Sequence, residues 1–136
     1  MTDRRGSGRI VRGMEPYERL IVWQKSHALA TDIYRLTATA PRDPLCVQLR
    51  RAGASVPTNL VEGLGGGSRA MLGRFVGYAC ASAYEVEYLL RLAAETSLIP
   101  AATADRLRAQ AVEVKRMLHS LKARTKERAS QKARPS

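Results

Sequence analysis

The spacing of small and apolar residues between positions 69 and 96 limits the possible folds of this chain more than any other feature. Alternating steps of three and four residues separate Leu72, Phe75, Ala79, Ser82, Val86, Leu89 and Ala93. Side chains at these intervals share one face of an α-helix. The sequence therefore predicts a long amphipathic helix over residues 69–96, with this face toward a core.

Three further segments show the same helical period of small and apolar side chains. Prolines and glycines separate the segments, since neither residue continues a helix readily. Asp43 and Ser68 stand just before two segments, where a side-chain oxygen can cap the first backbone N–H groups. Four amphipathic helices with short connections pack most simply as an antiparallel up-down four-helix bundle, so we predict an all-α fold for residues 16–124. The expected helices are residues 17–38, 44–62, 69–96 and 102–124.

The second expected helix contains an internal proline, Pro57. Proline lacks the N–H of the helical hydrogen bond, and its ring presses toward the carbonyl four residues earlier, here that of Gly53. Glycine is the least crowded residue there, so we predict one kinked or locally opened helix. Gly63 is expected to be the C-cap of this helix. The glycine-rich stretch after it lacks the Gly-Lys-Ser/Thr ending of a phosphate-binding loop.

The net charge of +11 lies mostly at the two ends of the chain. Residues 1–14 contain four arginines and one acidic residue, and residues 122–136 contain six basic residues and one acidic residue. We predict a disordered basic leader over residues 1–15 and a disordered basic tail over residues 125–136. Such ends suit RNA or DNA, because each neutralised phosphate releases counterions, although a solubilising role is the alternative.

The candidate nucleic-acid-binding residues are the basic side chains of two segments, the second expected helix and the C-terminal end. They are Arg50, Arg51, Lys122, Arg124, Lys126 and Arg128. For Arg50 and Arg51 a second interpretation stays open, in which the pair binds carboxylates such as Glu62 or a glutamate of a neighbouring subunit.

The histidines and cysteines favour a chain without catalytic chemistry. Neither His27 nor His119 has, three residues earlier, the glutamate that a carboxylate-bridged di-iron site requires. Cys46 and Cys80 are isolated in sequence, which is typical of buried thiols in a reducing compartment. We predict no cofactor, no metal site and no enzymatic activity.

Several polar residues recur on the second and third expected helices. Glu62, Glu85 and Glu87 could gather around a divalent ion, which would permit phosphodiester chemistry. With Asn59 and Ser82 facing them, a hydrogen-bonded cluster inside the bundle is the commoner arrangement. The predicted structural polar cluster consists of Asn59, Glu62, Ser82 and Glu85.

A second stripe on the helix predicted over residues 69–96 contains Tyr84 and Tyr88, one turn apart and beside small residues. This stripe lies roughly opposite the apolar one, so a monomeric bundle would expose it to water. Exposed tyrosines are typical of subunit contacts, and we predict that Tyr84 and Tyr88 form a homo-oligomer interface. The sequence has neither a transmembrane run nor the apolar segment of a secretion signal, so we expect a cytoplasmic protein with no membrane partner.

Three motifs occur in order along the chain. They are Tyr-Glu-Arg-Leu-Ile-Val-Trp-Gln-Lys at 17–25, Gln-Leu-Arg-Arg-Ala at 48–52 followed by Ser-Val-Pro-Thr-Asn-Leu-Val-Glu-Gly at 55–63, and Ser-Ala-Tyr-Glu-Val-Glu at 82–87. In these motifs the chain resembles the four-helix-bundle family of 23S rRNA intervening-sequence proteins, over about residues 16–121. The resemblance implies a cytoplasmic bacterial protein that assembles as a homopentamer. Family members can be encoded within insertions in 23S rRNA genes, and a more distant relative accompanies a reverse transcriptase.

Two functional hypotheses follow from the charge and the resemblance. In the first, the chain is a non-enzymatic oligomer that binds ribosomal RNA or another nucleic acid. In the second, it is an oligomeric adaptor that recruits a protein partner, such as a reverse transcriptase, and its charge is incidental.

Overall fold

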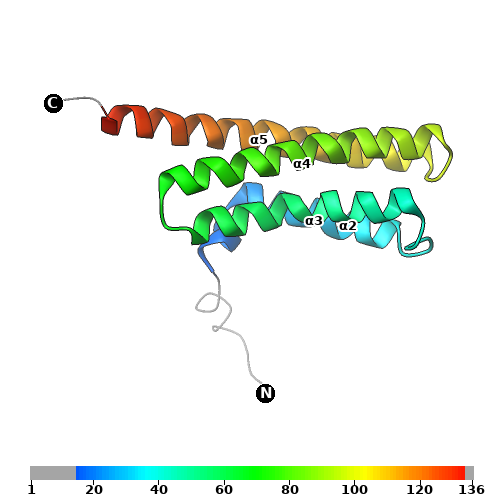
Figure 1. Cartoon of the computed structure of the whole chain (residues 1–136). Coiled ribbons are helices and arrows are strands. Elements are labelled where there is room, and N and C mark those ends of the chain that lie inside the picture. The colour runs from blue at the N-terminus through cyan, green and yellow to red at the C-terminus, as the bar shows by residue number, and fades with distance from the viewer. Residues whose placement is uncertain (1–14, 134–136) are drawn as a thin grey trace, which may run out of the picture.

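The structure, a computed structural model, describes the backbone of residues 15–133 and the side chains of residues 15–126. The described chain is all-α, with four α-helices, one short 3-10 helix and no strand. The elements are η1 (Pro16–Arg19), α2 (Ile21–Leu36), α3 (Pro44–Gly65), α4 (Arg69–Glu95) and α5 (Ala101–Ala133). In Figure 1, α4 and α5 lie above α2 and α3, and α5 extends past the start of α4.

The contacts between successive helices set the register of the bundle. Along the α3–α4 pair, Ser55 meets Ser82, and Gly63 lies against Leu72. Later residues of α3 therefore pack against earlier residues of α4, so the two helices run in opposite directions. The contacts of α4 with α5 follow the same order, from the Glu87–Lys115 ion pair to the packing of Gly73 on Thr125. Residues far apart in sequence are thus brought together along the whole length of α4.

The core fills the space between all four helices. On α4 the fully buried side chains include Val76, Ala83 and Leu90, which lie one position past Phe75, Ser82 and Leu89 of the predicted apolar stripe. Ala79, Val86 and Ala93 of the predicted stripe are fully buried as well. The predicted helical face is therefore correct in period, and its centre is turned by less than one residue position. Gly53 lies where a Cβ would approach Ile33 Cδ1 to 2.9 Å, so glycine permits close packing of α3 on α2.

Both predicted N-caps are confirmed. Asp43 accepts hydrogen bonds from the backbone N–H groups of Leu45 and Cys46, at 2.9 and 3.4 Å. The Ser68 hydroxyl accepts from the N–H of Met71 at 3.1 Å. The prediction of a single helix through Pro57 is also confirmed, since α3 continues on both sides of this residue.

Several predicted boundaries are wrong. Residues 17–38 do not form one helix, because the chain leaves η1 in an extended conformation at Leu20 and α2 ends at Leu36. Gly63 is a buried interior residue of α3, and Gly66 is the C-cap. The expected disordered tail is contradicted for residues 125–133, which continue α5. Residues 1–14 and 134–136, the rest of the leader and tail predictions, lie outside the described residues.

None of the described helices has both the length and the apolar character needed to cross a bilayer.

Candidate nucleic-acid interface

A basic cleft lies between the N-terminal part of α4 and the C-terminal part of α5, two segments that run side by side in Figure 1. Four of its lining side chains are cationic, and among the described residues its lining contains no carboxylate. Like charges gathered in this way repel one another, and a bound anion relieves the repulsion. The volume of this α4–α5 cleft is about 170 Å³. Its lining residues are Arg69, Ala70, Gly73, Arg74, Lys122, Thr125 and Lys126.

The backbone of α4 fixes the position of Lys122. Its Nζ atom donates a hydrogen bond to the carbonyl oxygen of Gly73 at 3.1 Å. Gly77, one turn along α4, makes room for this ammonium, because a Cβ there would lie 2.8 Å from Nζ. An ammonium has three donors, so two remain for a ligand after the bond to Gly73.

Thr125 allows α5 to approach α4 closely. It is buried, and its hydroxyl donates a hydrogen bond to the carbonyl oxygen of Lys122 at 2.7 Å. A Cβ at Gly73 would lie 3.1 Å from this hydroxyl oxygen, so glycine leaves the space that Thr125 occupies. The Thr125 hydroxyl proton is already used in this hydrogen bond, so it is not available to an anion in the cleft. The four cations are the remaining donors.

The start of α4 adds to the positive potential of the cleft. Arg69 is the first residue of this helix, and the first turn contains no acidic residue. Helix N-termini usually favour carboxylates, because the aligned peptide dipoles place partial positive charge there. An arginine at this position is electrostatically unfavourable until an anion is bound.

The predicted nucleic-acid-binding residues fall into different environments. Lys122 and Lys126 line the α4–α5 cleft. Arg124 is exposed on α5, outside the cleft lining. Arg128 belongs to the last turns of α5, and its side chain lies outside the described residues.

The end of α2 engages the Arg50 guanidinium. Its Nε donates to the Thr37 hydroxyl at 2.8 Å, and an Nη atom donates to the Tyr34 carbonyl at 3.2 Å. The guanidinium carbon also lies 4.3 Å from the centre of the Tyr34 ring. Arg50 therefore caps the C-terminal end of α2, where cations are favoured. Arg51 is exposed on the outer side of α3.

The predicted polar cluster forms only in part. The Ser55 and Ser82 hydroxyls are 2.8 Å apart across the α3–α4 contact. Asn59 Nδ2 donates to the Ser55 hydroxyl at 2.9 Å and to the Ser55 carbonyl at 2.8 Å. Ser55, which the prediction omitted, is therefore the central member. Glu62 and Glu85 were predicted as members, but both are exposed and lie outside the cluster.

The three glutamates considered as metal ligands are not brought together. Glu62 and Glu85 point into solvent from α3 and α4. Glu87 faces α5 instead, where it forms an ion pair with Lys115. Lys115 also lies 4.0 Å from the centre of the Tyr84 ring.

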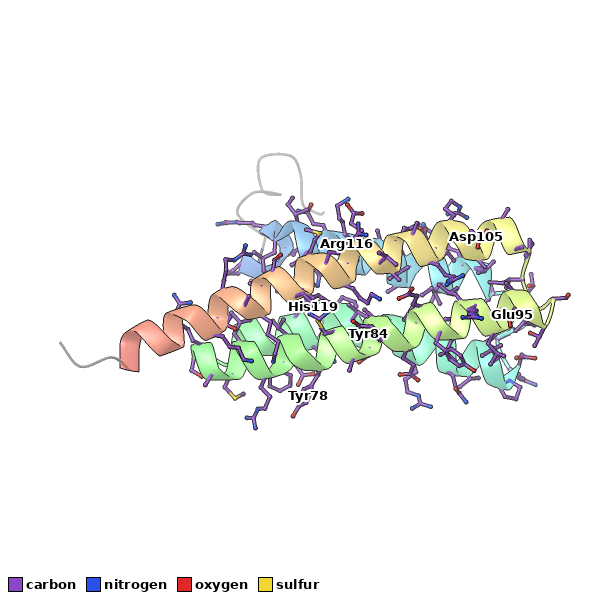
Figure 2. All side chains as sticks on the ribbon, turned by 90° about the horizontal axis from the view of Figure 1, so that it is seen from above. Tyr78, Tyr84, Glu95, Asp105, Arg116 and His119 are labelled. Atoms are coloured by element: carbon purple, nitrogen blue, oxygen red, sulfur yellow. The ribbon has the colours of Figure 1, made fainter. Side chains whose placement is uncertain are left out.

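The tyrosines of α4 lie on the surface of the bundle. Tyr84 and Tyr88 are 53% and 60% exposed, and Tyr78 is 51% exposed. Figure 2 shows Tyr84 beside His119 of α5, and their ring centroids are 6.1 Å apart. The two predicted interface residues are thus available on the outside of the described chain.

Arg69 and Arg74 were missed by reasoning from the sequence. They precede or interrupt the apolar stripe of α4 like ordinary solvent-exposed arginines, and no local motif distinguishes them. Only the register of α4 against α5 places them beside Lys122 and Lys126. The available signal was the absence of acidic residues from the first turn after Ser68.

A protein family and a solved structure are similar to this chain. The family model described as 23S rRNA-intervening sequence protein matches residues 18–120. A crystal structure from Bacteroides thetaiotaomicron VPI-5482, described as a protein with unknown function from the S23 ribosomal protein family, has 25% sequence identity and a TM-score of 0.70. That alignment covers 75% of this chain and 98% of the other. No curated protein matches the chain.

Proposed function

The chain belongs to the 23S rRNA-intervening sequence protein family, and from this premise we propose that it is a non-enzymatic, oligomeric bundle that binds structured RNA. The observation that supports the proposal most strongly is the α4–α5 cleft, with four cations and no carboxylate among its described lining residues. Positive charge held against a helix backbone suits the phosphates of a nucleic acid. Ribosomal RNA is the favoured partner, and the cytoplasm is then the expected place of action.

A binding role without catalysis agrees with the positions of the acidic side chains. Glu62 and Glu85 lie exposed on different helices, and Glu87 is paired with Lys115. Metal-assisted phosphodiester cleavage needs carboxylates that converge on one ion. Here the conspicuous charges on α4 and α5 are instead cations directed at the same cleft.

Assembly is the second part of the proposal. An up-down bundle of four helices exposes one side of α4, and Tyr84 and Tyr88 supply a large amphipathic surface there. Tyrosines of this kind are favoured at protein interfaces. We propose a homo-oligomer, with five subunits as the expected number, in which these two side chains contact a neighbouring copy. Light scattering of the full chain would then give a mass near five times that of the monomer, and Tyr84→Ala with Tyr88→Ala would lower it.

RNA binding is tested by titrating the full chain against a 23S rRNA fragment over a series of salt concentrations. The wild type should bind at low salt, and the logarithm of the affinity should fall linearly with the logarithm of the salt concentration. The double variant Arg69→Gln/Arg74→Gln should bind more weakly and with a smaller slope. The matched control Arg106→Gln/Arg116→Gln removes the same charge from exposed positions of α5 that do not line the cleft. Absent binding, or equal losses in the two double variants, would refute the proposal.

The adaptor hypothesis is the second candidate, and the exposed tyrosines favour it. Tyr84 and Tyr88 lie one turn apart on α4 and could contact a different protein in place of a second copy. In that case a partner captured from cell extract should survive nuclease treatment and high salt, and Tyr88→Ala should release it. Loss of the partner on nuclease treatment would favour RNA binding.

A further inference from the structure

The small size of the α4–α5 cleft restricts which part of an RNA it can hold. Its volume of about 170 Å³ lies below the range of about 300–1,000 Å³ that is typical of small-molecule sites. A phosphate group fits such a hollow. The base and ribose of a bound strand can then lie outside the lining residues.

The charge of the cleft also distinguishes among phosphates. Four cations surround the hollow, with no opposing carboxylate among the described lining residues. An internal phosphodiester brings one negative charge, whereas a phosphomonoester carries about −1.5 to −2 at pH 7 and has three strong acceptor oxygens. The terminal group therefore compensates more of the charge and can accept from more of the donors.

Lys122 gives the site a fixed centre. One of its three N–H donors is held by Gly73, and Gly77 leaves the space that its ammonium occupies. A lysine on the surface must lose side-chain freedom when it binds an anion, but this one is already positioned. Arg69, as the first residue of α4, adds the positive end of the helix to the same location.

From these observations we propose that the α4–α5 cleft binds the terminal phosphomonoester of an RNA strand. This inference rests on the proposed function and names the part of the RNA that the site recognises. A free end can insert its phosphate into the hollow, whereas a continuous strand has ribose on both sides of each phosphate and must lie across the opening. A phosphomonoester can occur at either end of an RNA strand, and the experiment distinguishes the 5′ end from the 3′ end.

The test compares three single-stranded RNA oligonucleotides of one sequence, ending in a 5′-phosphate, a 3′-phosphate or hydroxyls only. The full chain should bind one phosphorylated form about tenfold more tightly than the hydroxyl form, as a charge-assisted hydrogen bond implies. Lys122→Gln should remove this preference. Arg106→Gln, which removes one exposed cation from another part of α5, should leave the preference intact.

The outcomes separate this inference from the proposed function. Equal binding of all three oligonucleotides, with the usual salt dependence, would overturn the terminal-phosphate site and leave RNA binding in place. A preference that persists in Lys122→Gln would also overturn it, because the monoester would then bind elsewhere. Absence of binding to any RNA at low salt would overturn both proposals.

Discussion

Lys122 of α5 donates a hydrogen bond from Nζ to the carbonyl oxygen of Gly73 on α4, at 3.1 Å. The two residues are far apart in sequence, and the packing of Thr125 against Gly73 brings their helices together. A charge that would otherwise move freely at the surface is thereby held beside Arg69, Arg74 and Lys126. The cleft differs from the rest of this basic chain in the fixed position of one cation, more than in the number of its charges.

Removing the side chain of Arg50 should destabilise the bundle. Arg50→Ala removes two hydrogen bonds to the end of α2 and leaves the Thr37 hydroxyl, which is buried, without this donor. We expect the free energy of unfolding in urea to fall by about 1–2 kcal/mol. Arg51→Ala, the exposed neighbour, is the control and should change it little. Equal losses in the two variants would contradict the capping role.

Ser55 should matter more for stability than Glu62. Ser55→Ala removes the link between Asn59 and Ser82 and should cost about 1 kcal/mol. Glu62→Ala changes an exposed side chain outside the cluster and should leave the urea midpoint unchanged. The opposite ranking would return Glu62 to the polar cluster that the sequence predicts.

Two glycines of α3 should respond in opposite ways to alanine. In Gly53→Ala the new Cβ would lie 2.9 Å from Cδ1 of the fully buried Ile33, so we expect a loss of about 1–3 kcal/mol. Gly65→Ala meets nothing within 4 Å and should stabilise the last turn by about 0.4–1 kcal/mol. Thermal unfolding measures both, and a stabilised Gly53→Ala would show that α2 and α3 are less closely packed.

The two thiols should react slowly in the folded chain. Burial raises the pKa of Cys46 and the pKa of Cys80, although Lys122 and Lys115 oppose the shift at Cys80. A raised pKa keeps the neutral thiol in the folded state at pH values where the unfolded chain ionises, about pH 8.5. The associated stability is therefore full below that pH and is lost as the pH rises through the folded pKa. Labelling by a thiolate-specific reagent at pH 8.5 should be much slower in buffer than in urea, and equal rates would contradict the burial.

Local patterns predicted the fold more fully than the candidate site. The periods of the helices and the caps at Asp43 and Ser68 depend on residues close in sequence, so they could be read directly. The sequence does not indicate the continuation of α5 to Ala133, because its last turns have few apolar residues and low hydrophobicity predicts disorder. The turn of the α4 core relative to the predicted stripe depends on packing against α3 and α5.

The cleft depends on long-range contacts, which explains why its sequence signal is weak. Lys122 and Lys126 were recognised as basic residues of a tail, but their partners Arg69 and Arg74 belong to a different helix. The contact of the Arg50 guanidinium with the Tyr34 carbonyl was missed for the same reason, because Tyr34 belongs to a different helix. A charged residue can be identified from the sequence, whereas its partner is determined by the register of the helices.

Gly77→Ala is the sharpest test of whether the position of Lys122 governs RNA binding, because the substitution moves the Lys122 ammonium without changing any charge. The new Cβ would lie 2.8 Å from Nζ, so the flexible end of the lysine must shift, while alanine itself favours the helix. In a salt titration against a 23S rRNA fragment, we expect a several-fold weaker affinity of this variant at low salt. The slope of log affinity against log salt concentration should become less steep by about 0.7–0.9, which is the contribution of one phosphate contact. Thermal stability should not decrease. Wild-type affinity and slope in Gly77→Ala would instead show that the position of Lys122 has no effect on RNA binding.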